Sequence, residues 1–352
     1  MSIHRRPFEL PLRRPLSTAR GDIDVRRGFV VGGRADGSVG VGEATPLPDW
    51  TEPYAACRRA LDLVDDLGAA LSTGILDDAP AARHAVAGAL FDARARTEGV
   101  SVARFLAGDR TPVAERVPVN ATVGDASIDE TATEVRDAVD AGYGCVKVKV
   151  GVGGVGRDVD RLRAARDAAP EVDLRADANG AWSRADAETF VTALDDHGVD
   201  LDYVEQPLAA DRVAEHAALR ADSPVRIAVD ETLAQQSVDD VLAADAADVL
   251  VLKPMALGGP ARTLGVADRA AEAGVESVVT TTIDAVVARV TALHVAAALG
   301  DPPACGLATG EMLERDLTAD PAPVSAGAMR LPDGPGLAGD AFAGFVNEVE
   351  GE

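Results

Sequence analysis

Short apolar runs alternate with helical stretches from Val117 onward, and this repeat limits the folds open to the chain. The runs are Val117–Val123, Cys145–Val150, Val172–Ala176, Leu201–Val204, Val225–Val229, Val249–Leu252, Ser277–Thr280 and, more weakly, Ala304–Leu307. Such alternation predicts parallel strands joined by helical crossovers. Eight strands of this kind are the number that closes into a barrel, so the predicted fold class is α/β with a barrel.

The helices between these runs carry recognisable start signals. Ser127 followed by Glu130 is a capping-box pattern, and the pairs Ser183/Asp186 and Ser237/Asp240 resemble it. Each pair predicts the first turn of a helix directly after a strand and its loop. These signals therefore support the strand–helix repeat.

The first part of the chain does not show this strand–helix alternation. Antiparallel strands are predicted around Phe8–Leu12, Asp24–Val31 and Ser38–Glu43, helices at Pro53–Ser72 and Pro80–Glu98, and irregular lid-like loops at Pro15–Asp22 and Thr45–Thr51. The expected organisation is an α+β capping domain of residues 1–113, completed by a tail of residues 320–352, and a barrel of residues 114–319.

Charge and cysteine content exclude several classes of protein. A net charge of −24 and a pI near 4.5 argue against nucleic acid and anionic membranes as partners. The three cysteines are too few and too scattered for a disulfide framework or a zinc cluster. The start of the chain leads into no apolar signal region, and no run of about 18 apolar residues exists, so a cytoplasmic protein with a small-molecule partner is expected. These features do not predict the oligomeric state.

Lysine is almost absent from this chain. Of the 34 basic residues only Lys147, Lys149 and Lys253 are lysines, and each lies in or at the end of an apolar run. Because residues two apart in a strand share a face, Lys147 and Lys149 project together. Lysine, unlike arginine, can give up its proton near neutral pH, so its restriction to these positions indicates proton chemistry. The acidic, arginine-rich remainder suggests a salt-adapted, halophilic protein.

Ionisable residues also end five consecutive strands of the predicted barrel. They are Lys149, Asp177, Glu205, Asp230 and Lys253. The carboxyl ends of barrel strands form the mouth at which active sites are built. Strands two and six of a ring of eight lie opposite each other, so the two terminal lysines are expected to face each other across three carboxylates. One such acid alone is usually a helix cap or surface group, but five in register predict a site.

Three carboxylates gathered at one mouth need a cation. A like-charge pair at 4 Å costs about 4 kcal/mol at an effective dielectric near 20. An all-oxygen donor set of Asp177, Glu205 and Asp230 suits Mg²⁺, with Mn²⁺ as an alternative. Such a cation stabilises an enolate that forms beside a substrate carboxylate, and a lysine whose pKa the cation and partial desolvation lower is the expected base.

A glycine-rich segment supports a competing hypothesis. Gly151-Val-Gly-Gly-Val-Gly156 matches the dinucleotide fingerprint, with Asp177 some way downstream, which indicates an NAD-dependent oxidoreductase. A first Rossmann strand has no use for two lysines, however, and this hypothesis leaves Glu205, Asp230 and Lys253 unexplained. A non-catalytic, metal-stabilised scaffold is the other alternative outside this chemistry.

These motifs resemble the enolase superfamily, muconate-lactonizing subgroup. The resemblance covers nearly the whole chain and is carried by Lys147-Val-Lys149, Asp177-Ala-Asn179, Glu205-Gln-Pro207, Asp230-Glu-Thr232 and Lys253-Pro254. It implies a modified (β/α)7β TIM barrel beneath an N-terminal capping domain. It also implies that Asp177, Glu205 and Asp230 bind Mg²⁺, that Lys149 is the general base, that Lys253 is its opposing partner, and that Lys147 tunes Lys149 and contacts the substrate carboxylate.

Within the subgroup, three stretches are similar to the o-succinylbenzoate synthase family. They are Pro11–Gly21, Thr280–Asp284 and Cys305–Gly310. This similarity implies a lyase of menaquinone biosynthesis that dehydrates 2-succinyl-6-hydroxy-2,4-cyclohexadiene-1-carboxylate to o-succinylbenzoate. N-acylamino acid racemase, dipeptide epimerase and muconate cycloisomerase activities are the alternatives, although the strand-eight region lacks the Asp-x-Asp pair of dipeptide epimerases. The candidate substrate contacts are Asn179, Thr282, Asp284 and Gly306.

Overall fold

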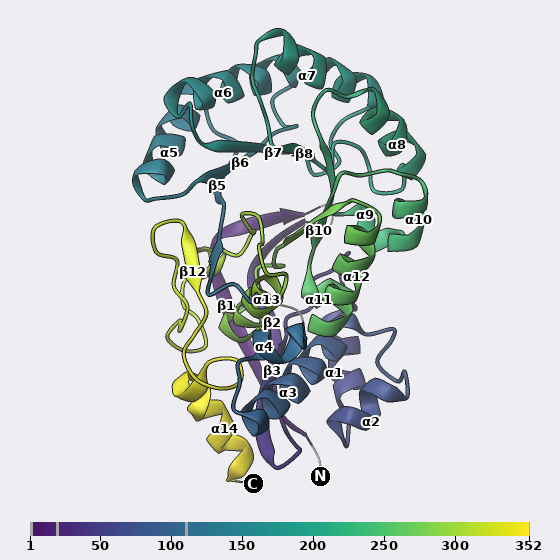
Figure 1. Ribbon diagram of the computed structural model, residues 1–352, viewed down its shortest axis with the longest axis vertical. Coiled ribbons are helices and arrows are strands. Elements are labelled where there is room, and N and C mark those ends of the chain that lie inside the picture. The colour runs from purple at the N-terminus through teal and green to yellow at the C-terminus, as the bar shows by residue number, and fades with distance from the viewer. Residues whose placement is uncertain (1–2, 19–20, 110–111, 352) are drawn as a thin grey trace.

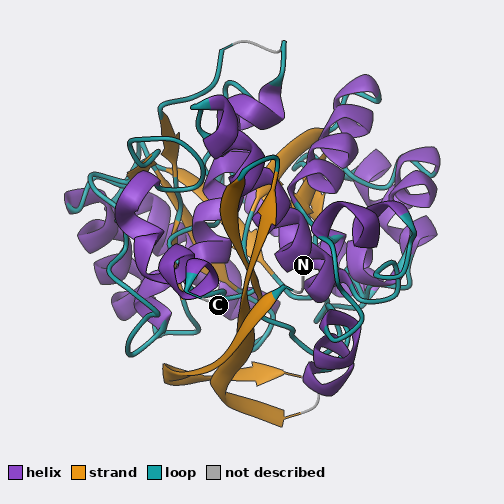
Figure 2. Cartoon of the chain, turned by 90° about the horizontal axis from the view of Figure 1, so that it is seen from below, coloured by secondary structure: helices purple, strands orange, loops and turns teal. Residues whose placement is uncertain are grey.

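The computed structural model describes residues 3–18, 21–109 and 112–351. Its N-terminal unit begins with an antiparallel sheet of β1 (His4–Thr18), β2 (Gly21–Ala35) and β3 (Ser38–Ala44), in that order. The turn between β2 and β3 places Asp36 and Gly37 at φ of 50° and 93°, which the Asp-Gly sequence favours. In Figure 2 the strands of this sheet run through the middle of the molecule with helices on either side.

The first hairpin is longer than its sequence predicted. Pro15–Asp22 was expected as an irregular loop, but β1 continues to Thr18 and pairs with β2 beyond a register shift between Pro11 and Leu16. The prediction of a loop over the whole stretch is therefore wrong, and its residues 19–20 lie outside the described residues. Backbone pairing across the register shift carries the strands through polar sequence that shows no apolar alternation.

In the described part of the chain the sheet is followed by α1 (Tyr54–Leu61), α2 (Leu67–Ser72), α3 (Pro80–Glu98) and α4 (Val102–Ala107), and α3 makes the main contact with it. The single helix expected over Pro53–Ser72 is divided, because the Asp66 side chain accepts from the Ala69 N–H and starts a second helix. Helix α3 has the predicted bounds. It lies very close to β3, since a Cβ on Gly40 or Gly42 would be 2.0 Å from a carbonyl oxygen of α3.

The barrel contains a seven-stranded parallel sheet. Its strands, in spatial and chain order, are β5 (Ala121–Val123), β6 (Cys145–Lys149), β7 (Asp173–Asp177), β8 (Tyr203–Glu205), β9 (Ile227–Val229), β10 (Val249–Leu252) and β11 (Glu276–Val279). The helices between and after them are α5 (Ile128–Asp140), α6 (Val155–Ala168), α7 (Arg184–Asp196), α8 (Val213–Asp222), α9 (Thr232–Gln235), α10 (Val238–Ala243), α11 (Pro254–Leu257), α12 (Pro260–Glu272) and α13 (Val286–Ala298). Figure 1 shows helices α5 to α8 around the outside of the curved sheet.

The predicted helix starts are present. Ser127 and Ser183 form full capping boxes with Glu130 and Asp186, and the Ser237 side chain accepts from the Asp240 N–H. Each cap satisfies an amide that the first turn of a helix leaves without a partner. The strand–helix repeat of the sequence is therefore confirmed in the structure.

The ring closes differently from the prediction of eight regular strands. The expected first strand, Val117–Val123, is divided into β4 (Arg116–Pro118), which pairs with β12 (Ala328–Arg330), and β5. The weak run Ala304–Leu307 closes the ring by single-residue bridges. Cys305 donates to Pro118 O at 2.8 Å, and Gly306 donates to Val279 O at 2.9 Å. A strand this short leaves little apolar signal, which explains its weakness in the sequence.

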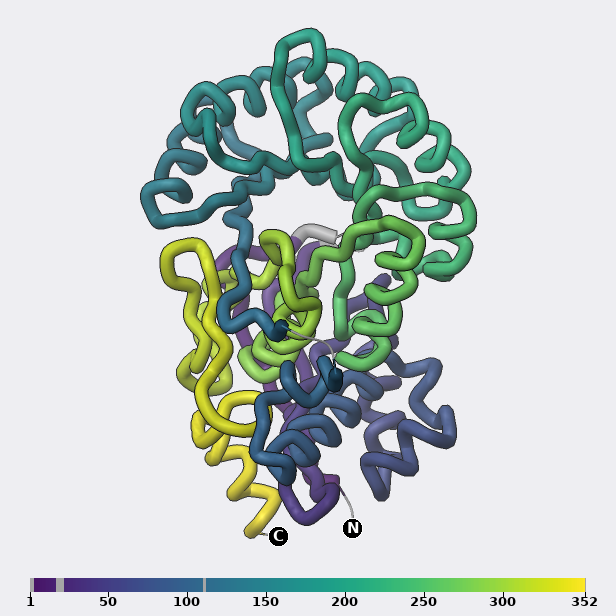
Figure 3. The backbone as a smooth tube through the Cα atoms, viewed as in Figure 1, coloured from purple at the N-terminus to yellow at the C-terminus, as the bar shows by residue number. Residues whose placement is uncertain are grey.

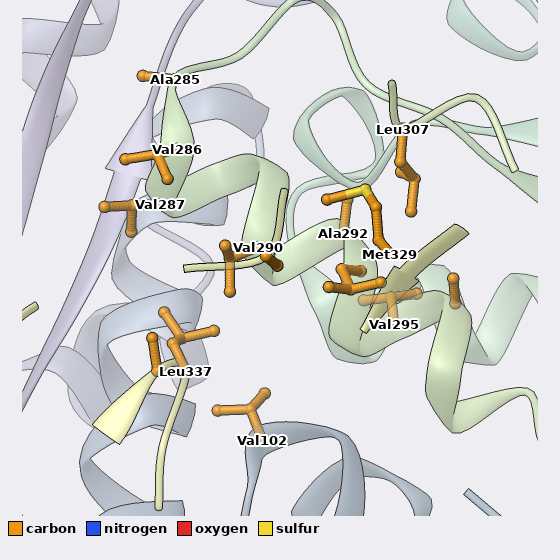
Figure 4. Close-up of a cluster of buried hydrophobic side chains, with 14 of the residues drawn as sticks. Val102, Ala285, Val286, Val287, Val290, Ala292, Val295, Leu307, Met329 and Leu337 are labelled. Atoms are coloured by element: carbon orange, nitrogen blue, oxygen red, sulfur yellow. The ribbon is translucent and has the colours of Figure 1, made fainter. Parts of the chain in front are cut away.

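Helix α13 forms the central packing element between the barrel and the N-terminal unit. Figure 4 shows Val286, Val290 and Val295 of this helix among Val102, Leu307, Met329 and Leu337. Glu43 of β3 caps the helix, since its two carboxylate oxygens accept from the Ala285 and Ala288 N–H groups at 2.8 Å. Burial and the nearby Asp284 raise the pKa of Glu43 to about 8.

The chain returns to the N-terminal unit after the barrel. The 3-10 turns Gly310–Met312 and Gly339–Phe342 and helix α14 (Ala343–Glu350) belong to this segment. The buried Asp92 of α3 accepts from Leu337 N at 2.7 Å and from Val41 N at 2.9 Å, which ties the tail to α3 and β3. Figure 3 shows the C-terminal segment beside N-terminal strands and helices, with both termini at one end of the molecule. None of the helices in the described part of the chain is long and apolar enough to cross a membrane.

Candidate active site

A cavity of about 670 Å³ lies at the carboxyl ends of the barrel strands. Its polar wall consists of Lys147, Lys149, Asp177, Asn179, Glu205, Asp230, Glu231, Gln235, Lys253 and the threonines 280–282. Apolar side chains of Leu16, Leu47, Pro48, Trp50 and Ile283 complete the lining, together with Asp49. Most of the apolar wall therefore comes from the N-terminal unit, which brings a non-polar surface opposite the ionised groups.

Two of the three lysines meet two carboxylates on one side of the cavity. Lys147 Nζ lies 2.8 Å from Glu205 Oε1 and 3.0 Å from Asp177 Oδ2. Lys149 Nζ lies 2.6 Å from Asp177 Oδ2 and 2.7 Å from Asn179 Oδ1. The register of the sheet explains this meeting, because Lys149, Asp177 and Glu205 are successive partners across β6, β7 and β8.

These contacts have large electrostatic effects on buried groups. Burial alone would lower the pKa of Lys147, but Asp177 and Glu205 outweigh it and hold that pKa well above its usual value. Burial would likewise raise the pKa of Asp177, but Lys147 and Lys149 hold it well below its usual range. Burial and the adjacent Asp177 raise the pKa of Glu205. The lysines thus supply positive charge that the acidic cluster requires. The Lys147 side chain is 15% exposed, whereas the Lys149 side chain is 34% exposed.

Lys253 occupies a different part of the mouth. It follows β10, which is four positions from β6 in the strand order, as the sequence predicted. Lys253 Nζ lies 2.5 Å from Asp230 Oδ1, and the Trp50 ring lies over it with 3.4 Å between Nζ and the ring centroid. The ammonium group is therefore held between a carboxylate of the barrel and an aromatic face of the N-terminal unit.

Gln206 holds the backbone at Asp230 and Thr232, a role that the sequence analysis did not assign although it quoted Gln206 in the motif Glu205-Gln-Pro207. Its Oε1 accepts from Asp230 N at 2.9 Å and from Thr232 N at 3.1 Å, while its Nε2 donates to Leu208 O at 2.8 Å. The backbone of Gln206 itself is in the left-handed region, with φ of 41°. The placement of Gln206 directly after Glu205, at a strand end, was the available signal.

Asn179 and Glu231 extend the polar wall. Asn179 accepts from Lys149 and donates from Nδ2 to Glu231 Oε1 at 2.9 Å, and the second oxygen of Glu231 is buried without a hydrogen-bond partner. Sequence reasoning named Asn179 but missed both Glu231 and Trp50. Glu231 adjoins Asp230 in the sequence, which was a usable signal, whereas no local pattern places Trp50 over Lys253.

Of the other candidate substrate contacts, Thr282 lines the cavity, whereas Asp284 and Gly306 do not. Thr282 lines the cavity, and its hydroxyl donates to Asp284 Oδ1 at 2.5 Å. Asp284 and Gly306 are not among the lining residues: Asp284 is buried beside Thr282, and Gly306 accepts from the Thr280 hydroxyl at 2.9 Å. Substrate contact by Asn179 and Thr282 stays a prediction. For Asp284 and Gly306 this placement supports a role behind the lining.

The donor set fits a hard divalent cation in its chemistry. Asp177, Glu205 and Asp230 supply carboxylate oxygens from three adjacent strands to one cavity, and each accepts a hydrogen bond from a lysine ammonium group. As these side chains stand, no three His, Cys, Asp or Glu residues in the described ranges are arranged as ligands of one ion. Each of the three acids contacts a lysine, and a shared metal site stays a prediction.

Residues 130–340 match the family described as Enolase C-terminal domain-like. The chain belongs to this family and is an enzyme of the enolase superfamily. It is 40% identical to an o-succinylbenzoate synthase from Thermobifida fusca over 330 residues. This match covers 90% of this chain and 83% of that protein.

Solved structures agree with this placement. A dipeptide epimerase from Methylococcus capsulatus, complexed with Mg and the dipeptide L-Arg-D-Lys, is 28% identical, with a TM-score of 0.83 and coverage of 96% of this chain and 98% of that chain. The muconate lactonizing enzyme from Pseudomonas fluorescens, complexed with muconolactone, is 26% identical, with a TM-score of 0.83 and coverage of 96% and 95%. The predicted barrel with an N-terminal α+β layer is therefore confirmed.

Proposed function

We propose that this enzyme dehydrates 2-succinyl-6-hydroxy-2,4-cyclohexadiene-1-carboxylate to o-succinylbenzoate, a step of menaquinone biosynthesis. The observation that carries the proposal is the pair of lysines, Lys149 and Lys253, on separate sides of one cavity whose polar wall holds three carboxylates. The 40% identity to an o-succinylbenzoate synthase supports this choice within the superfamily. Residues 1–113 with the tail 320–352 would form the capping domain, and residues 114–319 the catalytic barrel.

Lys149 removes the proton α to the substrate carboxylate in this proposal. The hydroxyl group then leaves the ring as its C–O bond breaks, and Lys149 returns the proton so that water departs and the ring becomes aromatic. Lys253 stabilises the developing negative charge from the opposite face, and Lys147 contacts the substrate carboxylate and tunes Lys149. The apolar wall of Leu47, Pro48 and Trp50 excludes water from the ring.

Asp177, Glu205 and Asp230 would hold Mg²⁺, or Mn²⁺ in its place. When bound, the cation supplies positive charge beside the substrate carboxylate as the α-carbon loses its proton. The epimerase from Methylococcus capsulatus was solved with Mg, which supports this assignment. A cytoplasmic setting is part of the proposal, because all three cysteines are free and buried.

An absorbance assay of the dehydration, with and without Mg²⁺, tests the function. Chelation should abolish turnover, and added Mg²⁺ should restore it. Lys149→Ala should lower kcat by about 10³-fold or more and keep Mg²⁺ binding, because only the base is lost. Asp177→Asn should weaken Mg²⁺ binding itself. Substantial dehydration by the Lys149→Ala variant would refute the assigned role.

Racemisation or epimerisation of an N-acylamino acid is the second candidate. The placement of Lys149 and Lys253 on separate sides of the cavity favours it, since such a reaction exchanges protons on opposite faces of one carbon. Solvent deuterium would then enter recovered substrate with inversion of configuration. In the proposed dehydration no inverted substrate is recovered, so one isotope experiment separates the two candidates.

A further inference from the structure

A buried arginine lies directly behind the strand that carries Lys149. The Arg161 side chain, in α6, is 0% exposed. Its Nη1 donates to the backbone oxygen of Lys149 at 2.7 Å, its Nη2 to Gly124 O at 2.5 Å, and its Nε to Thr131 Oγ1 at 3.0 Å. One guanidinium group therefore connects the end of β6, the segment after β5 and the first turns of α5.

Asp158 holds the same strand end from the other side of Val150. Its Oδ2 accepts from Gly151 N at 2.8 Å, and its Oδ1 lies 3.3 Å from Arg161 Nη1. Asp158 is as fully buried as Arg161. The backbone is thus fixed at the carbonyl of Lys149 and at the amide of Gly151, two peptide groups that follow the side chain of Lys149.

The glycine-rich segment that suggested a dinucleotide site makes this arrangement possible. Gly151 and Gly154 have φ of 94° and 87°, a region that favours glycine, and a Cβ on Gly151 would lie 2.8 Å from the Ala181 Cβ. These glycines turn the chain from β6 into α6 within a few residues. The turn brings Asp158 and Arg161 back to the end of β6, where both contact the backbone beside Lys149.

A buried ion pair is a poor source of stability, because its desolvation offsets much of the attraction. Its geometric effect here is specific, since both members bond to the backbone beside Lys149. We propose that Arg161 and Asp158 are positioning residues that fix the backbone of Lys149 and so aim its Nζ at the substrate. This inference rests on the proposed role of Lys149 as the base.

The contacts of the Lys149 side chain cannot perform this role alone. Asp177, which binds Nζ in the structure, is also a proposed metal ligand and so has a second partner during the reaction. Arg161 and Asp158 act on the backbone from outside the cavity, and neither is among the residues that line it. Their contacts are therefore independent of what the cavity holds.

The test compares Arg161 with a matched buried arginine at the other end of the barrel. Arg175 is 2% exposed, donates to Asp202 Oδ2 at 2.8 Å and donates to Ala304 O at 2.6 Å. Arg161→Met should lower kcat by about 10²-fold, the effect expected when a reacting group is misplaced by about 1 Å, with KM changed less than threefold. Arg161→Lys should recover part of kcat, and Arg175→Met should leave kcat within about threefold of the wild type.

Asp158→Asn supplies a second variant that changes little besides charge. It should lower kcat in the same direction and increase hydrogen exchange at the Gly151 amide, which is measurable without substrate. If Arg161→Met does not fold, Asp158→Asn decides the question. Equal kcat values for the Arg161 and Arg175 variants, or unchanged exchange at Gly151 in Asp158→Asn, would overturn the inference.

The two failures are distinguishable. A wild-type enzyme without dehydration activity contradicts the proposed function, and exchange at residues 149–151 then still tests whether the pair fixes the backbone. A wild-type enzyme that is active, with Arg161 and Asp158 variants of unchanged kcat, contradicts only the positioning role.

Discussion

The two ends of the barrel both contain buried or half-buried ion pairs, but they use different basic residues. At the mouth, Lys147, Lys149 and Lys253 contact Asp177, Glu205 and Asp230. At the opposite end, Arg175 and Arg226 contact Asp202, and Arg226 also contacts Glu276. Lys147 of β6 is the register partner of Arg175 of β7, so neighbouring strands of one sheet carry both kinds of ion pair.

The difference separates two uses of positive charge. Arginine stays protonated and binds carboxylates through a planar fork, which suits a permanent ion pair. Lysine is a flexible ammonium group that can lose its proton, which suits a base. Because all three lysines of the chain line one cavity, the type of basic residue distinguishes the mouth from the opposite end.

Replacing lysine by arginine at the mouth should produce the largest effect on kcat, and the reverse replacement at the opposite end should produce little. Lys149→Arg keeps the charge but cannot deprotonate at working pH, so we expect kcat to fall by about 10³-fold or more in the dehydration assay. Arg175→Lys keeps a charge at the opposite end and should change kcat by less than about threefold, with a lower melting temperature. Retained turnover in Lys149→Arg would remove the distinction between the two ends.

A buried histidine outside both ends should make the stability depend on pH in mild acid. His294 Nδ1 accepts from Ala103 N and Nε2 donates to Leu337 O, and burial lowers its pKa from 6.5 to about 4. Between pH 4 and pH 6.5 this histidine binds a proton in the unfolded chain but not in the folded chain. The contribution of His294 to the free energy of unfolding should therefore fall by about 3 kcal/mol as pH falls from 6.5 to 4, and then level off.

Urea unfolding at several pH values measures this slope. His294→Gln should flatten it while leaving the pH dependence of kcat unchanged. An unaltered slope in that variant would contradict the assignment to His294.

Weakening the arginine ion pairs at the end opposite the mouth should lower the stability and leave the activity unchanged. Asp202 accepts from Arg175 at 2.8 Å and from Arg226 at 3.1 Å, so Asp202→Asn removes charge from two arginine contacts at once. We expect a loss of about 1–3 kcal/mol in the free energy of unfolding, with kcat unchanged. The matched control is Asp222→Asn in an exposed pair with Arg184, where the loss should be below about 1 kcal/mol. A fall in kcat for Asp202→Asn would contradict the separation.

Salt should have the smallest effect on this comparison and act on the whole surface. A net charge of −24 produces self-repulsion that counterions screen. Raising the salt from about 0.1 M to molar concentration should stabilise the fold by about 1 kcal/mol or more, with a rise in melting temperature of a few degrees. Thermal unfolding across a salt series checks this, and a falling melting temperature would argue against salt adaptation.

Residues that depend on strand register could be predicted from the sequence. Lys149, Asp177, Glu205 and Asp230 each stand at the end of a predicted strand, and a barrel brings all such positions to one mouth. The resemblance to the superfamily added the roles of these residues. Their roles as ligands and base stay predictions, but their gathering around one cavity was predicted correctly.

The missed features depend on contacts between segments distant in sequence. Trp50 reaches Lys253 only after the N-terminal unit packs on the barrel, and Arg161 of α6 contacts Gly124, which precedes α5 in the chain. The break in the helix predicted over Pro53–Ser72 depends on one side-chain cap at Asp66. Apolar periodicity contains no information on such contacts, which explains why the strand ends were predicted and these residues were not.

The cap that Glu43 places on helix α13 has a consequence for synthesis of the chain. The carboxylate and the amide of Ala288 are 245 positions apart, so a ribosome makes the acid long before the helix that it caps. During that interval helix α3 can already pack on β3, but the Glu43 carboxylate has no helix amides to accept from. Folding of the first segment must therefore be completed late, and a nascent chain halted before residue 285 should stay sensitive to proteases at β3.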